Sequence, residues 1–322
     1  MPSDTASGPS PHSRQGFGAT DAWLVFMAVI WGVNYSVVKA GLAHLSPLVF
    51  NGTRMVLATV VLFTVAAFVR GTPWPKGRER IQLLLIGLLG NGLYQVLFIF
   101  GLSRTRAGVA ALIVAATPAW IAIISQVIGR ERVTRISAVG IGMQLLGVAC
   151  VVGSAHGFGG DGGGVMWGAA LMAGGSVCWA LFTVLLQPHT QRAHPLHLSA
   201  VTMTSGAVLI VSISLPDMLR LDWGAVPLSA WGSVVYAGIG ALVVAYLLYY
   251  HGVRVLGPTR TSMYSNLQPV IALGVAWLML HEQPSGWQLL GAAFILGGLL
   301  LSRVSRRTAA SPAGTSEGLR RA

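Results

Sequence analysis

Two short stretches, Thr117-Pro118-Ala119 and Gln268-Pro269-Val270, decide how this chain is built. Each places a proline inside a long apolar run, and a glutamate, Glu131 or Glu282, follows thirteen residues after each proline. Proline is uncommon inside a helix because it lacks a backbone N–H and its ring clashes with the preceding turn. The same spacing in both halves of the chain indicates an internal duplication.

The composition around these stretches is that of a membrane protein. Of the 322 residues, 54% are hydrophobic and only 9% are charged, whereas about a quarter are charged in soluble domains. The chain carries too few polar side chains to cover a water-soluble protein of this size. We therefore expect an all-α protein that spans a lipid bilayer.

The net charge of +12 does not indicate a nucleic-acid partner, because the basic residues lie in short loops and in the C-terminal tail. Cys150 and Cys178 lie inside apolar segments without the spacing of metal ligands. We interpret both as small hydrophobic residues packed between helices. No metal and no cofactor is expected.

Ten apolar segments are long enough to cross a hydrocarbon core, which takes about 20 helical residues. They are residues 22–42, 47–69, 81–102, 105–128, 134–154, 165–187, 197–215, 229–251, 257–280 and 286–304. Residues 1–20 and the basic residues 306–322 are predicted to be disordered tails. The first apolar segment has no evident cleavage site, and we expect it to remain in the mature protein.

Lys and Arg residues predict the orientation of these segments. Fifteen of the 21 fall on the side of the two termini and four on the opposite side, with Arg54 and Arg260 inside segments. Positive charge collects on the cytoplasmic side of membrane proteins. We expect a multi-pass protein of the inner membrane with both termini in the cytoplasm.

The duplication extends over the whole apolar region. An offset of 151 residues aligns Gly87 with Gly238, Pro118 with Pro269, Glu131 with Glu282, Gly140 with Gly291 and Gly147 with Gly298. An offset of 148 aligns Trp31 with Trp179, Pro47 with Pro195 and Met55 with Met203. We assign residues 21–155 and 164–305 to two repeats of five helices. Because five is odd, the repeats are inverted, as in many secondary transporters.

Several of these residues resemble the EamA-type branch of the drug/metabolite transporter superfamily. The resemblance covers residues 22–304 and is carried by Trp31-Gly32-Val33-Asn34-Tyr35, by Pro47 with Arg54, by Pro118 with Glu131 and by Pro269 with Glu282. It implies a ten-helix carrier, often an exporter of amino acids or related compounds. It also implies a cavity between the first, third, fourth, sixth, eighth and ninth helices. His281 and the pair Trp179-Ala180 depart from the pattern.

Pro118 and Pro269 are predicted to lie near the middle of the membrane. Each deprives the carbonyl four residues earlier, that of Val114 or Ser265, of its usual N–H partner. A freed carbonyl must face protein or a water-filled cavity. The prolines therefore either border a substrate site or form packing kinks.

Aromatic and amide side chains on the same helices are the candidate substrate contacts. Tryptophan and tyrosine also collect at membrane interfaces, and buried amides also join helices, so these alternatives stay open. Together with the two prolines, the candidates are Trp31, Asn34, Tyr35, Tyr94, Gln95, Phe98, Trp120, Trp179, Thr183, Tyr246, Tyr249, Tyr264, Asn266 and Gln268.

Four of the charged residues within or beside the spans have candidate roles. Arg54 is well inside its span and must face the bundle interior or extend to the interface. Lys39 is expected to extend to the interface, or to attract an anion. Glu131 and Glu282 are expected to cap the helices that follow them, or to form gating contacts. We assign Arg54, Glu131 and Glu282 structural or gating roles.

The pattern as a whole favours a secondary transporter that exports amino acids or related small metabolites by alternating access. The spans carry no carboxylate near their middle, so proton coupling, exchange and facilitated diffusion all stay open. We weigh two alternatives: an exporter of drug-like cations, and an intramembrane enzyme acting on lipid-linked substrates. No phosphate-binding loop or catalytic constellation supports an enzyme. The expected partners are a small-molecule substrate and the bilayer, and the oligomeric state is open.

Overall fold

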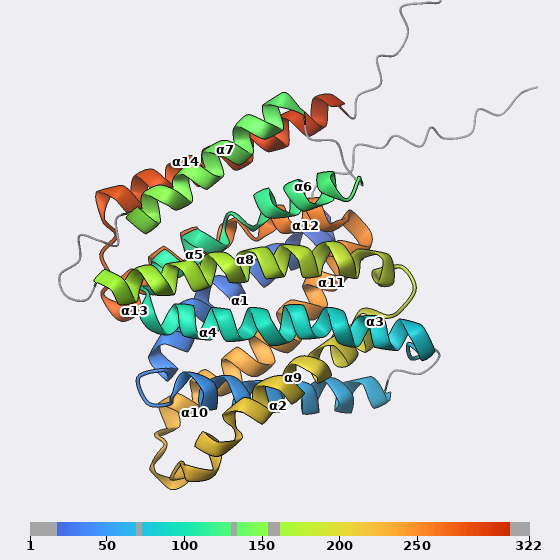
Figure 1. Cartoon of the computed structure of the whole chain (residues 1–322), viewed down its shortest axis with the longest axis vertical. Coiled ribbons are helices and arrows are strands. Elements are labelled where there is room, and N and C mark those ends of the chain that lie inside the picture. The colour runs from blue at the N-terminus through green and yellow to red at the C-terminus, as the bar shows by residue number, and fades with distance from the viewer. Residues whose placement is uncertain (1–17, 69–72, 130–133, 154–161, 310–322) are drawn as a thin grey trace, which may run out of the picture.

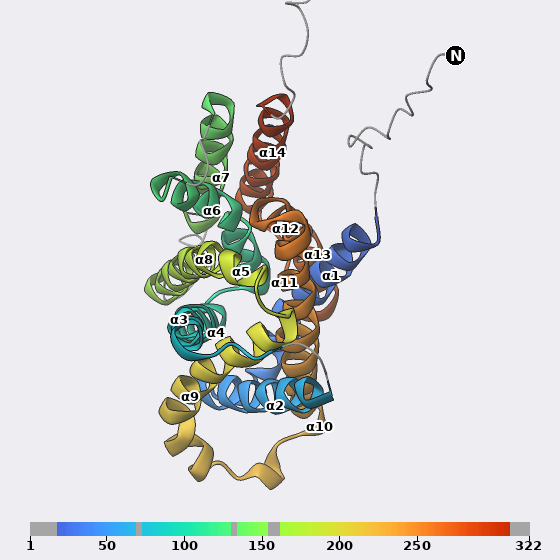
Figure 2. The ribbon, with the colours of Figure 1, turned by 90° about the vertical axis from the view of Figure 1, so that its right-hand side faces the viewer.

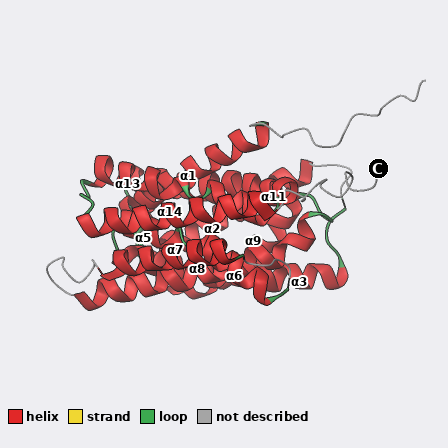
Figure 3. Ribbon diagram, turned by 90° about the horizontal axis from the view of Figure 1, so that it is seen from above, coloured by secondary structure: helices red, strands yellow, loops and turns green. Residues whose placement is uncertain are grey.

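The structure is a computed structural model that describes residues 18–68, 73–129, 134–153 and 162–309. Helices joined by short loops make up this whole part of the chain (Figure 3). The prediction of an all-α fold is therefore confirmed.

The helices follow the predicted order of spans. In the first half they are α1 (Ala19–Gly41), α2 (Pro47–Phe68), α3 (Gly77–Gly87), η1 (Leu88–Leu93), α4 (Tyr94–Arg104), α5 (Ala107–Val114), α6 (Thr117–Val127) and α7 (Arg135–Gly153). In the second half they are α8 (Gly162–Thr190), α9 (Pro195–Arg220), η3 (Trp223–Ala225), α10 (Leu228–Val235), η4 (Tyr236–Val244), α11 (Ala245–Leu256), α12 (Pro258–Tyr264), α13 (Leu267–Leu280) and α14 (Gly286–Ala309).

Nine helical stretches within the described residues are long and apolar enough to cross a membrane, and a shorter apolar helix lies within α14 at Gly286–Leu301. Several helices extend beyond the predicted spans because helix continues past the apolar core into polar residues. For example, α1 begins at Ala19, inside the segment assigned to the N-terminal tail, and α14 continues to Ala309. Each of the ten predicted segments is helical over most of its described residues.

Two of the spans are broken near their middle, at corresponding places in the two halves. The fourth span divides into α5 and α6 around Ala115 and Ala116, and the ninth divides into α12 and α13 around Ser265 and Asn266. The broken spans are neighbours, since α5 contacts α13 and α6 contacts α12. Each proline stands in the first turn of the second piece, where its missing N–H costs little.

Two π-helical segments also correspond between the halves. Residues 88–93 form η1 inside the third span, and the same residues plus 151 fall within η4 of the eighth span. A π segment widens the helix and often occurs at a functional site. Gln95 follows η1 and Tyr246 follows η4 at equivalent positions.

Equivalent residues of the two repeats meet at the centre of the molecule. Gln95 Nε2 donates a hydrogen bond of 3.1 Å to the Tyr246 hydroxyl, and these two residues are 151 apart. Trp31 and Trp179, which are 148 residues apart, pack edge to face with their ring centroids 5.9 Å apart. A residue can contact its own equivalent only next to the axis that relates the repeats. The inverted repeat is therefore visible in side-chain contacts.

The last spans of the two repeats, α7 and α14, lie side by side at one end of the molecule (Figures 1 and 2). They run antiparallel, and small residues let their backbones approach closely. A Cβ added at Gly147 would lie 2.6 Å from the Gly291 carbonyl oxygen, and one at Gly298 would lie 2.4 Å from that of Gly140. The four glycines that align in sequence thus face one another across the axis.

Gly147→Leu should separate α7 from α14. The new side chain has no room against the Gly291 backbone, and such overpacking costs roughly 1–3 kcal/mol. We expect a lower melting temperature for the detergent-purified protein. Gly142→Leu on the same helix is the control, because nothing lies within 4 Å of its added Cβ. Equal melting temperatures for the two variants would contradict this packing.

Candidate functional site

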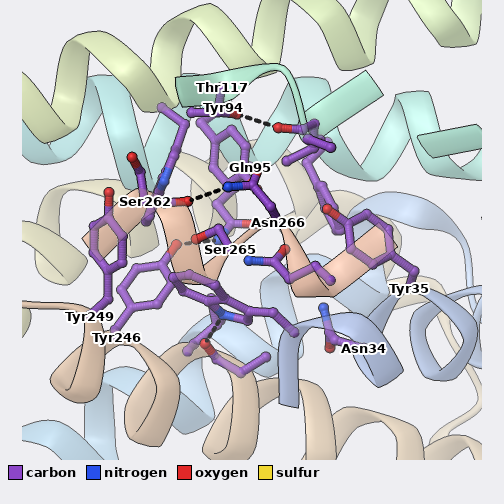
Figure 4. A pocket seen from close by; sticks show the side chains of 18 of the residues that line it. Asn34, Tyr35, Tyr94, Gln95, Thr117, Tyr246, Tyr249, Ser262, Ser265 and Asn266 are labelled. Atoms are coloured by element: carbon purple, nitrogen blue, oxygen red, sulfur yellow. Dashed lines mark hydrogen bonds between the residues drawn. The ribbon is translucent and has the colours of Figure 1, made fainter. Parts of the chain in front are cut away.

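A cavity lies at the centre of the bundle, where the helix breaks and the repeat axis meet (Figure 4). Side chains from both repeats form its wall. The lining residues are Trp31, Asn34, Tyr35, Arg54, Tyr94, Gln95, Phe98, Val114, Ala115, Thr117, Pro118, Trp179, Ala241, Leu242, Tyr246, Tyr249, Ser262, Ser265, Asn266 and Gln268.

The backbone groups freed at the helix breaks are satisfied by neighbouring protein groups. Thr117 Oγ1 donates to the Val114 carbonyl at 2.5 Å and lies 2.9 Å from Ser176 Oγ of α8. The Ser265 carbonyl accepts from the Gln268 N–H at 3.1 Å. The carbonyls of Val114 and Ser265 thus lack their usual helical N–H partners, as expected, and a side chain and a tighter turn replace the missing bonds.

Asn266 donates to backbone carbonyls at the second break, as Thr117 does at the first. Its Nδ2 donates to the carbonyls of Met263 at 2.8 Å and Ser262 at 3.3 Å, closing the end of α12. Two polar side chains at the breaks thus hold the irregular backbone beside the cavity.

An aromatic cluster of Trp31, Tyr94, Trp179, Tyr246 and Tyr249 forms one wall. Ring centroids in this cluster are between 5.0 and 5.9 Å apart. Trp31 Nε1 donates to the Ala241 carbonyl at 3.0 Å, which fixes the indole. The wall is apolar, rigid and rich in π faces.

Arg54 places a positive charge on the same cavity although it is only 1% exposed. Its Nε donates to Asn51 Oδ1 at 2.9 Å and its Nη2 to Gln95 Oε1 at 2.8 Å. The guanidinium lies 5.6 Å from the Phe98 ring centre and 5.7 Å from that of Phe50. No described carboxylate pairs with it, since the ion pairs of the described residues are His189–Glu79 and Arg260–Asp21.

Twelve of the sixteen predicted substrate contacts line the cavity, and the other four do not. The twelve are Trp31, Asn34, Tyr35, Tyr94, Gln95, Phe98, Pro118, Trp179, Tyr246, Tyr249, Asn266 and Gln268. Arg54, predicted as structural or gating, joins them on the wall.

The remaining four residues have other partners. Trp120 packs against Ile121, Ala180 and Val184 between α6 and α8. It is two residues after Pro118 in α6, and residues two apart do not share a helix face. Thr183 lies behind the aromatic cluster, where Oγ1 is 2.9 Å from the Tyr249 hydroxyl.

Tyr264 and Pro269 also lie off the wall. The Tyr264 hydroxyl donates to Asp21 Oδ1 near the start of α1, which directs the ring away from the cavity. Pro269 is buried within the first turn of α13, although its equivalent Pro118 lines the cavity.

Glu282 caps a helix, but not the helix that follows it. Its two carboxylate oxygens accept from the backbone N–H groups of Ala107 at 3.2 Å and Gly108 at 3.4 Å, at the start of α5 in the other repeat. The expectation that it caps its own following helix is wrong. Glu131 lies outside the described residues.

Lys39 binds to the turn between α4 and α5, next to the start of α5 that Glu282 caps. Its Nζ donates to the carbonyls of Leu102, Ser103 and Thr105 at 2.6–3.2 Å, at the C-terminal end of α4. These carbonyls are freed at the helix end and are favourable partners for a cation.

The sequence did not single out eight of the cavity residues as substrate contacts. Thr117 and Arg54 could have been added from their positions, beside a midplane proline and inside a span. The small or aliphatic Val114, Ala115, Ala241, Leu242, Ser262 and Ser265 carry no such signal. They line the cavity because the breaks and η4 bring their backbones there.

A family model for the EamA-like transporter family matches residues 19–153 and, separately, residues 166–304. The chain belongs to the EamA-like transporter family. The two matches coincide with the two repeats seen in the structure. A protein of known crystal structure has the same fold, with a TM-score of 0.63 and 20% identity over 89% of this chain and 98% of its own.

Named relatives are also transporters. The chain is 25% identical to "Uncharacterized transporter YyaM" of Bacillus subtilis (86% of this chain, 91% of that protein). It is 27% identical to "Probable terminal-alkyne amino-acid exporter" of Streptantibioticus cattleyicolor (88% and 93%). It is 29% identical to "Uncharacterized inner membrane transporter YedA" of Escherichia coli K12 (80% and 80%). This EamA-like protein is thus a multi-pass membrane transporter and not an enzyme.

Thr117→Val should weaken the break between α5 and α6. The Val114 carbonyl then lacks its hydroxyl donor, and an unsatisfied buried carbonyl costs roughly 1–3 kcal/mol. We expect a lower melting temperature and slower transport. Thr117→Ser keeps the hydroxyl and should behave like the wild type. If Thr117→Val and Thr117→Ser have equal melting temperatures and equal transport rates, the hydroxyl does not stabilise the break.

Glu282→Ala should destabilise the start of α5. Loss of an N-terminal cap costs roughly 0.5–2 kcal/mol, and Glu282→Gln, which keeps one acceptor oxygen, should lose less. Melting temperatures in detergent measure both. Gln283→Ala, a change at the neighbouring exposed residue, serves as the control and should have no effect. A melting temperature unchanged in Glu282→Ala would show that the cap is not used.

Proposed function

We propose that this transporter is a secondary carrier that exports amino acids or related small metabolites across the inner membrane by alternating access. The observation that carries the proposal is the central cavity, which lies on the repeat axis and combines amides, one cation and an aromatic wall. Inverted-repeat carriers bind their substrates near the midplane at the repeat interface, often where helices are discontinuous. The breaks after α5 and α12 fit that construction.

The choice of substrate is supported by the chemistry of the wall and by one relative. Amides and a guanidinium recognise polar, charged groups, whereas the aromatic cluster suits an apolar side chain. The relative from Streptantibioticus cattleyicolor bears the name of a probable amino-acid exporter. An amino acid with an apolar side chain has both kinds of group.

The proposed membrane and orientation follow from charge and from a second relative. The excess of Lys and Arg on the side of the termini favours cytoplasmic termini. The Escherichia coli relative is named an inner membrane transporter. Since no residue of the described cavity wall is acidic, we propose facilitated diffusion or exchange rather than coupling through a carboxylate.

A second candidate is export of lipophilic cations. The aromatic cluster favours it, because π faces attract a desolvated cation. Arg54 opposes it, because a second positive charge in the same cavity would be repelled. Because of the positive charge of Arg54, we prefer amino acids to lipophilic cations as the substrate.

Transport by the purified protein in liposomes tests whether the substrate is an amino acid or a lipophilic cation. We expect counterflow of radiolabelled neutral amino acids, and no movement of a lipophilic phosphonium cation. Trp179→Leu removes part of the aromatic wall and should slow transport. Trp277→Leu, which alters a tryptophan that is 57% exposed on α13, is the matched control and should not. Movement of the phosphonium cation without any amino acid would favour the second candidate.

A further inference from the structure

The two repeats do not contribute equivalent residues to the whole cavity wall. Six pairs of residues at the 148- or 151-residue offset line it together, among them Trp31 with Trp179 and Gln95 with Tyr246. Eight further wall residues have an equivalent that lies off the wall. These eight, each followed by its equivalent, are Asn34 (Phe182), Tyr35 (Thr183), Arg54 (Thr202), Tyr94 (Ala245), Pro118 (Pro269), Ala241 (Gly90), Leu242 (Asn91) and Ser262 (Ala111).

The unmatched wall residues show toward which end of the molecule the cavity extends. Tyr35 is six residues before the end of α1 and Arg54 is seven residues after the start of α2, so both lie near the α1–α2 turn. Their equivalents Thr183 and Thr202 are each seven residues from the α8–α9 turn, which lies at the opposite end of the molecule (Figure 1). The cavity therefore extends toward the α1–α2 turn.

Close packing fills the corresponding space near the α8–α9 turn. Phe182 of α8 is fully buried, and a Cβ added at Gly90 of η1 would lie only 2.3 Å from its ring. The equivalents of Phe182 and Gly90 are Asn34 and Ala241, and both of these line the cavity. The same two positions thus pack together in one half of the molecule and border open space in the other.

Polar side chains are buried within this closely packed half. Thr202 Oγ1 is 3.3 Å from the Tyr250 hydroxyl, and the Asn91 amide lies beside the same hydroxyl without a hydrogen bond of normal geometry. Ser199 Oγ, one turn before Thr202, has no partner among the described residues. An unpaired polar group inside a membrane protein is costly unless water or a ligand reaches it in another state.

Alternating access in an inverted-repeat carrier supplies such a state. The two repeats are related by an axis in the membrane plane, so in the opposite-facing state each repeat adopts the arrangement that the other has in the present one. The half of the cavity near the α1–α2 turn then packs closed, and the half near the α8–α9 turn opens.

We propose that Asn91, Thr183 and Thr202 are substrate-binding residues of the opposite-facing state, an inference that rests on the alternating access of the proposed function. In that state η1 separates from α8 and these three side chains line the cavity, while Tyr35 and Arg54 leave its wall. The cavity then presents hydroxyls and an amide where it now presents a phenol and a guanidinium. It binds neutral hydrogen-bonding groups of the substrate and no longer attracts a negative one.

Cysteine labelling from each face of the membrane tests this proposal. The starting protein carries Cys150→Ala and Cys178→Ala and must still transport. Thr183 and Thr202 are then replaced singly by cysteine, which has a similar volume. Membrane-impermeant methanethiosulfonate reagents are applied to spheroplasts, which expose one face of the membrane, and to inside-out vesicles, which expose the other.

We expect Thr183→Cys and Thr202→Cys to react from the face marked by Arg192→Cys, a change at an exposed residue of the α8–α9 turn. Because a minor state is populated at roughly 0.1–10%, the reaction is followed over time, and its rate should exceed that of Ser36→Cys about tenfold or more. Ser36 is the matched control, because it is fully buried and neither it nor its equivalent Val184 lies on the wall.

A second change should shift the population toward the opposite-facing state. Gly90→Ala adds a methyl group that has no room against Phe182, whereas the equivalent Ala241 carries one on the open wall. Combined with Thr202→Cys, it should raise the labelling rate about fivefold or more, the factor for an overpacking cost of at least ~1 kcal/mol. Gly174→Ala on α8 should leave the rate unchanged, because its added Cβ meets its nearest atom at an ordinary 3.7 Å.

The outcomes distinguish this inference from the proposed function. Ser265→Cys, on the wall at the equivalent of the wall residue Val114, should react from both faces if access alternates. If it does, but the two threonine positions react no faster than Ser36→Cys or only from the opposite face, those threonines merely join helices. The inference is then wrong and the transport function stands.

Two further results would count against the proposal. If Ser265→Cys reacts from one face only, alternating access fails and this inference fails with it. If Gly90→Ala accelerates Ser36→Cys as much as Thr202→Cys, the change loosens the whole bundle and does not shift it between states. Should a threonine variant not fold, Asn91→Cys replaces it in the same comparison.

Discussion

A backbone in lipid must find every hydrogen-bond partner within the protein, and this constraint organises the centre of the molecule. Pro118 and Pro269 each remove a backbone donor, and the helices break beside them at two equivalent places. The freed groups are taken up by Thr117, by Asn266 and by a tight turn at Ser265. Because irregular backbone at this depth must face protein or a wet cavity, the two breaks and the cavity occur together.

The same region concentrates the polar groups that lipid would not tolerate. Arg54, Gln95, Asn34 and Asn266 are all buried on the cavity wall. Gln95 serves two purposes, since its oxygen accepts from Arg54 and its amide donates to Tyr246 across the repeat axis. A single amide thus joins the charged wall to the aromatic wall and one repeat to the other.

Most of this architecture could be predicted from sequence, since hydrophobic runs and repeated prolines are properties of single segments. The directions of individual side chains could not. Trp120 is two residues after Pro118 in the same helix, yet it packs against α8 instead of lining the cavity. Glu282 caps α5 because folding brings the start of that helix close, although 174 residues separate Glu282 from Gly108. Contacts of this kind depend on the packing of distant helices, for which local spacing holds no information.

The hydrogen bond between Gln95 and Tyr246 bears on the energetics of a transport cycle. If the repeats were identical in sequence, the conformation open to one side of the membrane and its exchanged counterpart would have equal free energies. Gln95 is not identical to Tyr246, and Arg54 has Thr202 as its counterpart at the 148-residue offset. Differences at such equivalent positions give an inverted-repeat protein a preferred resting side. In this chain the two differences are connected, since Arg54 donates to Gln95 and Gln95 donates to Tyr246.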